Sequence, residues 1–340
     1  AVDPANAVDP TIAVDPANKD RIIIGGLDLW AYEYGSDIEP ISFWSGFEGS
    51  GYYVHADQHE ILYHPTIAGK FYVANDGGVY STTDNGDNFL ALNRGYGVTQ
   101  FYTLGFSKEG YVIGGTQDNG TQLLNFSNPT SDMSSDEVRG GDGGFALISH
   151  IDSDVMFAES QNGSAGRSGD GGASFGNLDS FLGDEISGLA QSASDANADG
   201  LFATFINPME LWESVNEDGS PKDTSFFFAA TSDANGDFCA YMTKGALDFA
   251  SVPVWFQVTP NGSTITRMAV SPDGNHLFFA RGSSLYRTDN LNNDSILDTY
   301  DNLDIDGETS VVATIGLNLP GSNTITSISF DNNNQNTIVV

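Results

Sequence analysis

Cysteine and basic residues are both scarce in this chain of 340 residues. Cys239 is the single cysteine, so no disulfide can form within the chain. Lysine and arginine together number 12, against 46 aspartates and glutamates, which gives a formal net charge of −34. A surface this acidic repels the phosphates of nucleic acids and the headgroups of anionic membranes. We therefore expect no nucleic-acid partner.

Long apolar runs and long amphipathic runs are missing as well. No stretch of about 18 consecutive apolar residues occurs, so the sequence predicts no membrane span. The 39 glycines, together with many Asn and Asp residues, indicate frequent tight turns. Because 39% of the residues are hydrophobic, the chain can still bury a sizeable core. This composition favours an all-β protein.

Short apolar runs separated by polar turns recur along the sequence. Three of these units align on Asp57, Gln100 and Gly143, which lie 43 residues apart. That spacing suits a four-stranded blade. We predict one all-β domain over residues 1–340, a β-propeller of about seven four-stranded blades.

The ends of this repeat pattern are irregular. Residues 12–14 and 21–25 indicate a partial first unit, and the fifth unit is expected to begin with a strand at 201–206. Only two strands, 325–330 and 337–340, are expected in the seventh blade, which is therefore incomplete in this chain. An unfinished blade leaves strand edges open to pairing. We expect the natural polypeptide to continue, or a further chain segment or subunit to complete the blade.

Two segments match the Asp-box pattern Ser/Thr-x-Asp-x-Gly-x-x-Phe/Trp, namely residues 82–89 and 168–175. In a tight hairpin of this kind the Asp accepts hydrogen bonds from turn amides, the Gly takes a positive φ and the aromatic ring packs between blades. A structural role away from any active site is expected. The residues concerned are Asp84, Gly86, Phe89, Asp170, Gly172 and Phe175.

Further motifs accompany the two boxes, at residues 54–59, 75–80, 114–120 and 140–143. Together they resemble the Asp-box (BNR-repeat), sortilin-like propeller proteins of secreted bacterial type, over roughly residues 10–180. The resemblance implies a secreted or cell-surface protein. Many relatives carry a C-terminal sorting domain for type IX secretion, so that route is implied too. Several relatives are labelled glycosyl hydrolases.

In a propeller, the loops that enter the innermost strands share one face with the turns between second and third strands. Carboxylates, imidazoles and amides should gather on that face and could bind a ligand. The alternative is that they tie neighbouring blades together through buried hydrogen bonds. The candidates are His55, Asp57, His59, Asp76, Gln100, Gln117, Asp118, Asn119, Asp142, Glu159 and Gln161.

Two patterns could hold a metal ion, although no cofactor is required. His55, Asp57 and His59 alternate, so on a strand all three would face one side. Asp195, Asn197 and Asp199 have the oxygen spacing of a calcium loop. The twelfth position of that loop is Ile206 instead of Glu, which excludes an EF-hand.

Two functions from different classes fit the sequence. The first is a binding or structural module for an extracellular glycan, a protein or a neighbouring subunit. The alternative is a glycoside hydrolase with paired carboxylates in a central funnel, for which Asp57, Asp118 and Asp142 are candidates. A sialidase would need a convergent arginine triad, and the seven arginines show no placement that repeats from blade to blade.

Overall fold

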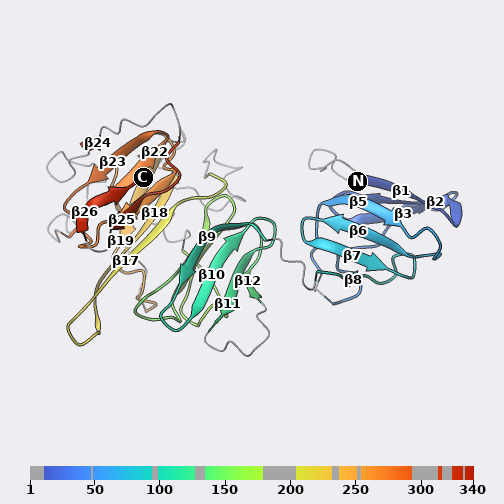
Figure 1. Cartoon of the computed structure of the whole chain (residues 1–340), viewed down its shortest axis with the longest axis horizontal. Coiled ribbons are helices and arrows are strands. Elements are labelled where there is room, and N and C mark those ends of the chain that lie inside the picture. Colours follow the sequence, from blue (N-terminus) through green and yellow to red (C-terminus); the bar gives the residue numbers. More distant parts are fainter. Residues whose placement is uncertain are drawn as a thin grey trace. The chain divides into compact units, whose positions relative to one another are not determined.

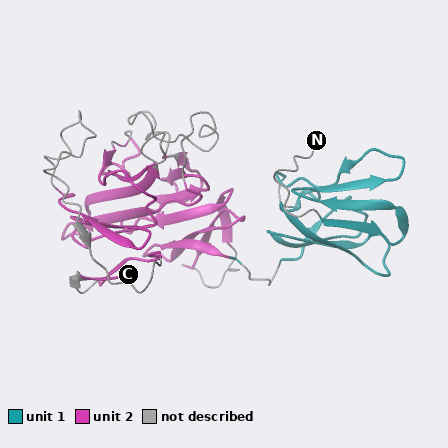
Figure 2. Cartoon of the chain, turned by 90° about the horizontal axis from the view of Figure 1, so that it is seen from above, with its two compact units in different colours: residues 1–99 teal, residues 100–340 magenta. Residues whose placement is uncertain are grey.

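The computed structural model describes most of the chain. The described residues are 11–46, 49–93, 99–126, 135–178, 204–231, 237–250, 253, 255–292, 313–315, 324–331 and 334–340. These residues form strands and turns, and they contain no helix that could cross a membrane. The chain divides into two compact units, unit 1 over residues 1–99 and unit 2 over residues 100–340 (Figure 2).

Unit 1 contains two four-stranded antiparallel sheets, each with its strands in chain order (Figure 1). We call them blade 1 (β1–β4) and blade 2 (β5–β8). The strands are β1 (Thr11–Asp15), β2 (Asn18–Gly25), β3 (Leu29–Glu33), β4 (Glu39–Pro40), β5 (Gln58–Tyr63), β6 (Phe71–Asn75), β7 (Gly78–Thr82) and β8 (Leu90–Ala91).

Unit 2 contains four further four-stranded antiparallel sheets and one two-stranded sheet within its described residues. We call them blade 3 (β9–β12), blade 4 (β13–β16), blade 5 (β17–β20), blade 6 (β21–β24) and blade 7 (β25 and β26). The strands are β9 (Phe101–Phe106), β10 (Tyr111–Thr116), β11 (Thr121–Asn125), β12 (Ser135–Arg139), β13 (Gly143–Ile148), β14 (Met156–Ser160), β15 (Ser164–Ser168), β16 (Gly176–Asn177), β17 (Met209–Val215), β18 (Pro221–Thr231), β19 (Phe238–Thr243), β20 (Phe256–Gln257), β21 (Arg267–Val270), β22 (Leu277–Arg281), β23 (Ser284–Thr288), β24 (Ala313–Ile315), β25 (Ser329–Asp331) and β26 (Asn334–Val339).

The prediction of an all-β propeller is confirmed, because consecutive four-stranded antiparallel meanders are the blades of that fold. The described residues contain six such sheets, followed by the two-stranded sheet at Ser329–Asp331 and Asn334–Val339. That two-stranded sheet lies where the sequence predicts the incomplete seventh blade. A single domain over residues 1–340 stays a prediction.

Two predicted blade boundaries are wrong. Blade 1 is a complete four-stranded sheet, because Leu29–Glu33 and the very short Glu39–Pro40 add two strands to the predicted pair. Blade 5 begins at Met209–Val215, and residues 204–208 form no strand. In Met209–Val215, Met209 is buried and Leu211, two residues further along, packs on the same core, as expected because alternate residues of a strand face one side.

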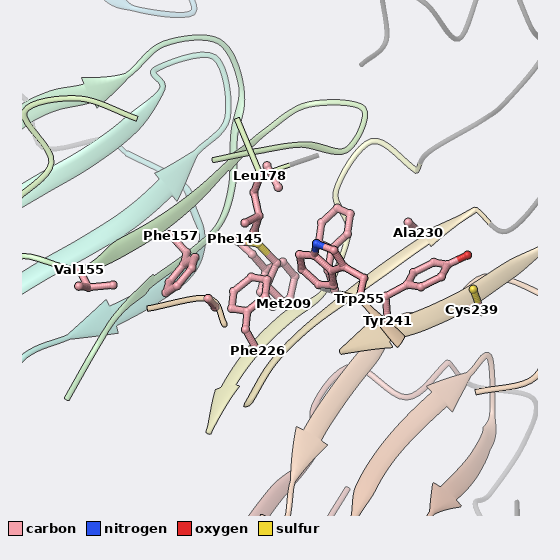
Figure 3. Packing of buried hydrophobic residues seen from close by; sticks show 13 residues of the cluster. Phe145, Val155, Phe157, Leu178, Met209, Phe226, Ala230, Cys239, Tyr241 and Trp255 are labelled. Carbon is pink, nitrogen blue, oxygen red and sulfur yellow. The ribbon is translucent and has the colours of Figure 1, made fainter. Parts of the chain in front are cut away.

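The largest core cluster lies between blades 4 and 5 (Figure 3). The rings of Phe157 in β14 and Phe226 in β18 stack with their centroids 4.4 Å apart, and Trp255 meets Phe226 edge-on. Cys239 is fully buried in the same cluster. This packing holds the two blades together, since a close-packed core has a low compressibility.

Blades 3 and 4 approach each other so closely that only glycine fits between them. A Cβ atom on Gly115 would lie 2.0 Å from the carbonyl oxygen of Gly144, and one on Gly143 would lie 2.3 Å from that of Gly120. Either contact is far inside van der Waals distance. The glycine-rich motifs at residues 114–120 and 140–143 therefore serve backbone packing between blades.

Candidate functional site

Each four-stranded blade has two ends, which we name by their turns. The upper end carries the turn between the second and third strands, and the lower end carries the other two turns. The sequence predicts the functional site at the upper end. The predicted residues divide between the two units: His55, Asp57, His59 and Asp76 belong to unit 1, and the others belong to unit 2.

The upper end of blade 2 brings two of its predicted residues together. His59 Nε2 lies 2.5 Å from Asp76 Oδ1, and both side chains are partly exposed. The expected alternation of three ligands on one strand is wrong, because β5 begins only at Gln58 and Asp57 adopts a left-handed φ of 63°. Only His59 of the three lies on the strand, so the alternation of side chains along a strand does not apply to His55 and Asp57.

A buried amide pair beneath these residues was missed by the sequence analysis. Gln58 and Asn75 are buried, and Asn75 Nδ2 donates to Gln58 Oε1 at 3.2 Å. Both amides also donate to the carbonyl oxygen of His55, and Gln58 donates to that of Leu27 in blade 1. The strand position of Gln58 and Asn75 gave no signal of this role, which ties blade 2 to blade 1.

The upper end of blades 3 and 4 shows a chain of hydrogen bonds between turns. Asp142 Oδ1 accepts from the Asp118 backbone N–H at 2.9 Å, and the Asp142 N–H donates to Gln161 Oε1 at 2.8 Å. Gln117 Oε1 accepts from the Tyr102 hydroxyl, and Asn119 Nδ2 donates to the carbonyl oxygen of Gln117. Burial, with the nearby charges of Asp142 and Asp118, raises the pKa of Tyr102. The structure thus brings these predicted residues together as ties between turns.

Glu159 is the most deeply buried of the predicted site residues, with no exposed area. Its Oε1 atom accepts from the backbone and side-chain N–H groups of Asn207 at 2.7 and 2.8 Å, and its Oε2 atom accepts from the Phe145 N–H at 3.3 Å. Desolvation raises the pKa of Glu159 to about 8, although these donors act in the opposite direction. Glu159 therefore holds the chain entering blade 5 against blade 4, out of reach of a substrate.

A hydrolase would need two carboxylates facing one open space. Of the three candidates, Asp57 belongs to unit 1, whereas Asp118 and Asp142 belong to unit 2. Asp142 already serves as a turn acceptor for Asp118. The contact between Asp118 and Asp142 is therefore a hydrogen bond between the turns of blades 3 and 4, which is the structural role and not the catalytic one.

The described arginines are used in the same way. Five of them donate to a backbone carbonyl of the next or preceding blade at 2.7–3.1 Å: Arg21 to Asn85, Arg139 to Ser164, Arg167 to Ala246, Arg267 to Thr326 and Arg281 to Phe238. Arg287 pairs with Asp289. Among the described residues the guanidinium groups thus fasten the scaffold and do not form a triad for a ligand carboxylate.

The two segments with the Asp-box pattern adopt matching turns at the lower ends of blades 2 and 4. Thr82 Oγ1 donates to Asp84 Oδ1 at 2.7 Å, which also accepts from the Asn88 N–H at 2.9 Å. Ser168, Asp170 and Ser174 repeat both bonds at 2.7 and 2.9 Å. Gly86 and Gly172 have φ values of 95° and 87°. Phe89 packs against the core of unit 1, and Phe175 against the cluster between blades 3 and 4.

These turns hold their carboxylates in the charged form. Hydrogen bonds from Asn88 and Thr82 lower the pKa of Asp84, and those from Ser174 and Ser168 lower the pKa of Asp170 to about 2. Hydrogen bonds to an ionised oxygen favour ionisation. The predicted calcium loop of Asp195, Asn197 and Asp199 lies outside the described residues, and within the described part no three His, Cys, Asp or Glu side chains group to hold a metal.

A cleft of about 520 Å³ opens at the lower end between blades 4 and 5. Its apolar lining comes from Ile151, Val155 and Leu247. Val155 belongs to the core cluster shown in Figure 3, and Leu247 packs against that cluster. The cleft therefore lies against the largest core cluster of the described residues, and its volume lies in the range of small-ligand sites.

Charged side chains surround the apolar lining of this cleft. Lys222 has no partner in the part of the chain that the structure describes, and Lys244 Nζ lies 3.4 Å from Asp223 Oδ2. Asp152 and Asp248 complete the charged rim. Two of the five lysines of the chain thus line one cleft of a very acidic protein. Nothing in the sequence pattern indicated this site.

Comparisons with known proteins add little to this geometry. No protein-family model matches the sequence, and no curated protein matches it. Among solved structures, the chain is similar to one titled "Structure of Dos1 propeller", with a TM-score of 0.35 and 12% sequence identity. That alignment covers 82% of this chain and 68% of the other.

Proposed function

We propose that this protein is a secreted or cell-surface binding module that holds an extracellular glycan or protein without cleaving it. The observation that carries the proposal is the cleft between blades 4 and 5, with its apolar lining and its charged rim. Convergent polar groups around an apolar recess are the usual composition of a ligand site. Lys222 and the charged groups beside it can contact a ligand without any change in the scaffold.

The polar groups at the upper end support a module without catalysis. Glu159 has the raised pKa that a general acid needs, but it is fully buried and both its oxygens accept hydrogen bonds from the scaffold. A catalytic acid must lie within hydrogen-bond reach of the substrate. Glu159 does not meet this condition, which supports binding without hydrolysis over the glycoside hydrolase alternative.

The location outside the cell rests on the sequence. The Asp-box motifs resemble those of secreted bacterial propellers, and a strongly acidic surface favours solubility. Cys239 is buried and gives no exposed thiol to oxidise. Fractionation of cells that express the natural gene tests this part directly, since protein found only in the cytoplasm would contradict it.

Binding and hydrolysis should be tested on the same preparation. The intact chain is screened on arrays of glycans and peptides, and each ligand that binds is incubated with the protein and analysed for cleavage products. We expect binding without products. The double variant Lys222→Ala/Lys244→Ala should weaken binding of ligands that occupy the cleft, whereas Lys108→Ala, a lysine on another blade, should not. Cleavage of any bound glycan would overturn the proposal, as would the absence of any ligand on both arrays.

A further inference from the structure

One segment of unit 1 exposes an unusual concentration of aromatic rings. Between β4 and β5, Phe43 is 48% exposed, Trp44 49% and Tyr52 56%. The other tryptophans of the chain, at positions 30, 212 and 255, are all less exposed than Trp44. Leaving three large rings in water within ten residues costs hydrophobic free energy, so a cluster of this kind marks a contact surface.

Hydrogen bonds hold the backbone at Phe43, Trp44 and Tyr52. The Trp44 N–H donates to Asp28 Oδ1 at 2.8 Å, and the Ser42 hydroxyl donates to the same oxygen at 3.2 Å. The Phe43 N–H donates to the carbonyl oxygen of Tyr52 at 3.0 Å, so these two residues lie opposite each other on paired segments. Because the backbone that carries the rings is already ordered at these residues, binding a ligand costs little further backbone entropy there.

Polar groups beside the rings remain available to a ligand. The Trp44 indole N–H, the Tyr52 hydroxyl and Asp28 Oδ2 make no hydrogen bond within the described residues. Burial raises the pKa of Asp28, while hydrogen bonds from Trp44 and Ser42 lower it less strongly. The surface therefore combines flat apolar faces with one donor, one acceptor and one hydroxyl that can serve as either.

The geometry points to a binding platform for neutral polysaccharide, formed by Phe43, Trp44 and Tyr52 with Asp28 beside them. A sugar ring has an apolar face of C–H groups that packs on an aromatic ring and a rim of hydroxyls that donate and accept hydrogen bonds. No basic side chain is part of this surface, and the net charge of −34 repels anionic polysaccharides. The ligand class follows from these two facts. The inference rests on the proposed binding function but places a second, independent site in unit 1.

Affinity electrophoresis of the intact chain in gels that contain soluble β-glucan, mannan or polygalacturonate tests the platform. We expect retardation by at least one of the two neutral polymers and none by polygalacturonate. Trp44→Ala should weaken binding about tenfold or more, which corresponds to about 1.4 kcal/mol. The affinity of Trp44→Phe should lie between those of the wild-type protein and Trp44→Ala, because this variant keeps a ring but loses the indole N–H. Asp28→Asn keeps the acceptor for the Trp44 backbone and replaces the free oxygen with a donor, so it should weaken binding less than Trp44→Ala.

The matched control is Tyr34→Ala, which removes an 81% exposed ring at the opposite end of blade 1 and should leave binding unchanged. Thermal unfolding of each variant separates loss of the ring from loss of the fold. Failure of the wild-type protein to bind either neutral polymer would overturn the platform, as would full binding by Trp44→Ala. Loss of neutral-polymer binding in the Lys222/Lys244 double variant alone would place the site in the cleft, leaving the proposed function intact. Cleavage of the polymer would contradict the proposed function and not the platform.

Discussion

In blade 4, a carboxyl group at the upper end and one at the lower end have pKa shifts in opposite directions. At the upper end Glu159 is buried and its pKa is raised to about 8. At the lower end Asp170 lies in an exposed turn, where its pKa is lowered to about 2. Hydrogen bonds reach both groups, so desolvation decides the difference. The upper end is built as scaffold, whereas the lower end leaves a cleft with open polar groups.

The largest loss of stability is expected from removing the hydrogen bonds that Glu159 accepts at the upper end. Glu159→Leu leaves the two N–H groups of Asn207 and that of Phe145 without an acceptor in a buried place. Each unsatisfied donor costs about 1–3 kcal/mol, so the free energy of unfolding should fall by about 3 kcal/mol or more. Urea titration measures it. Glu217→Leu, at an exposed position, is the matched control and should change stability by less than about 0.5 kcal/mol. Equal stability of the two variants would refute the assigned role of Glu159.

A second effect of the buried carboxyls concerns pH. Glu210 in β17 keeps some solvent contact, yet desolvation raises its pKa from 4.5 to about 8, as it does for Glu159. A raised pKa means that the folded state binds more protons than the unfolded state between these values. The stability that these groups contribute is therefore present below pH 4.5 and is lost as the pH rises through about 8.

The slope should be at most about 1.4 kcal/mol for each pH unit and each group. Denaturation at several pH values measures it in the wild-type protein and in Glu210→Gln, which cannot ionise and should show a shallower loss of stability towards alkaline pH. An unchanged slope in Glu210→Gln would show that Glu210 is ionised in the folded protein at neutral pH.

The lower end should show the reverse pH dependence with a smaller amplitude. The pKa of Asp170 is depressed, so its contribution is present above 3.8 and is lost as the pH falls towards about 2. Asp170→Asn should lower the midpoint of thermal unfolding at neutral pH, and the difference from wild type should shrink in acid. Asp84→Asn, in the matching turn of blade 2, should behave alike. A difference that persists undiminished at the acid limit would point to lost shape complementarity in place of lost charge.

The smallest effect on stability is expected at the rim of the cleft. Lys222 has no described partner, and the contacts of the Lys244 ammonium are long, at 3.4 Å to Asp223, 3.4 Å to Asn292 and 6.0 Å to the centre of the Trp212 ring. Removing both amines should therefore change the free energy of unfolding by less than about 0.5 kcal/mol. Differential scanning calorimetry checks this. A large loss of stability would show that the lysines belong to the scaffold and would weaken the assignment of the cleft as a ligand site.

Some strands could be predicted from the sequence and others could not. Phe71–Asn75 buries every second side chain, and its apolar residues predict a strand. The outer strands Glu39–Pro40 and Ser135–Arg139 are short or polar and carry no such alternation. They are strands because the neighbouring strand of the same sheet offers them a row of backbone partners. That reason is absent from their own residues.

Part of the candidate site could likewise be predicted from the sequence, and part could not. The sequence placed Gln117, Asp118, Asp142 and Gln161 together at one end, and the structure brings them into one set of hydrogen bonds. Whether such groups bind a ligand or one another depends on distances between blades, which residue types do not encode. The cleft was not predicted, because its walls come from three separate segments of blades 4 and 5.

The sequence by itself determined the repeat of blades and the two matched turns. In those turns the hydrogen bonds that Asp84 and Asp170 accept from side chains and from the Asn88 and Ser174 N–H groups join residues at most four positions apart, so local spacing is sufficient to specify these bonds. Only the tertiary structure decided that Glu159 is a buried hydrogen-bond acceptor between blades, since its partner Asn207 lies 48 residues away. It also decided that Trp44 stays exposed while Trp255 is buried. Burial depends on which segments pack against a residue, and no local pattern contains that information.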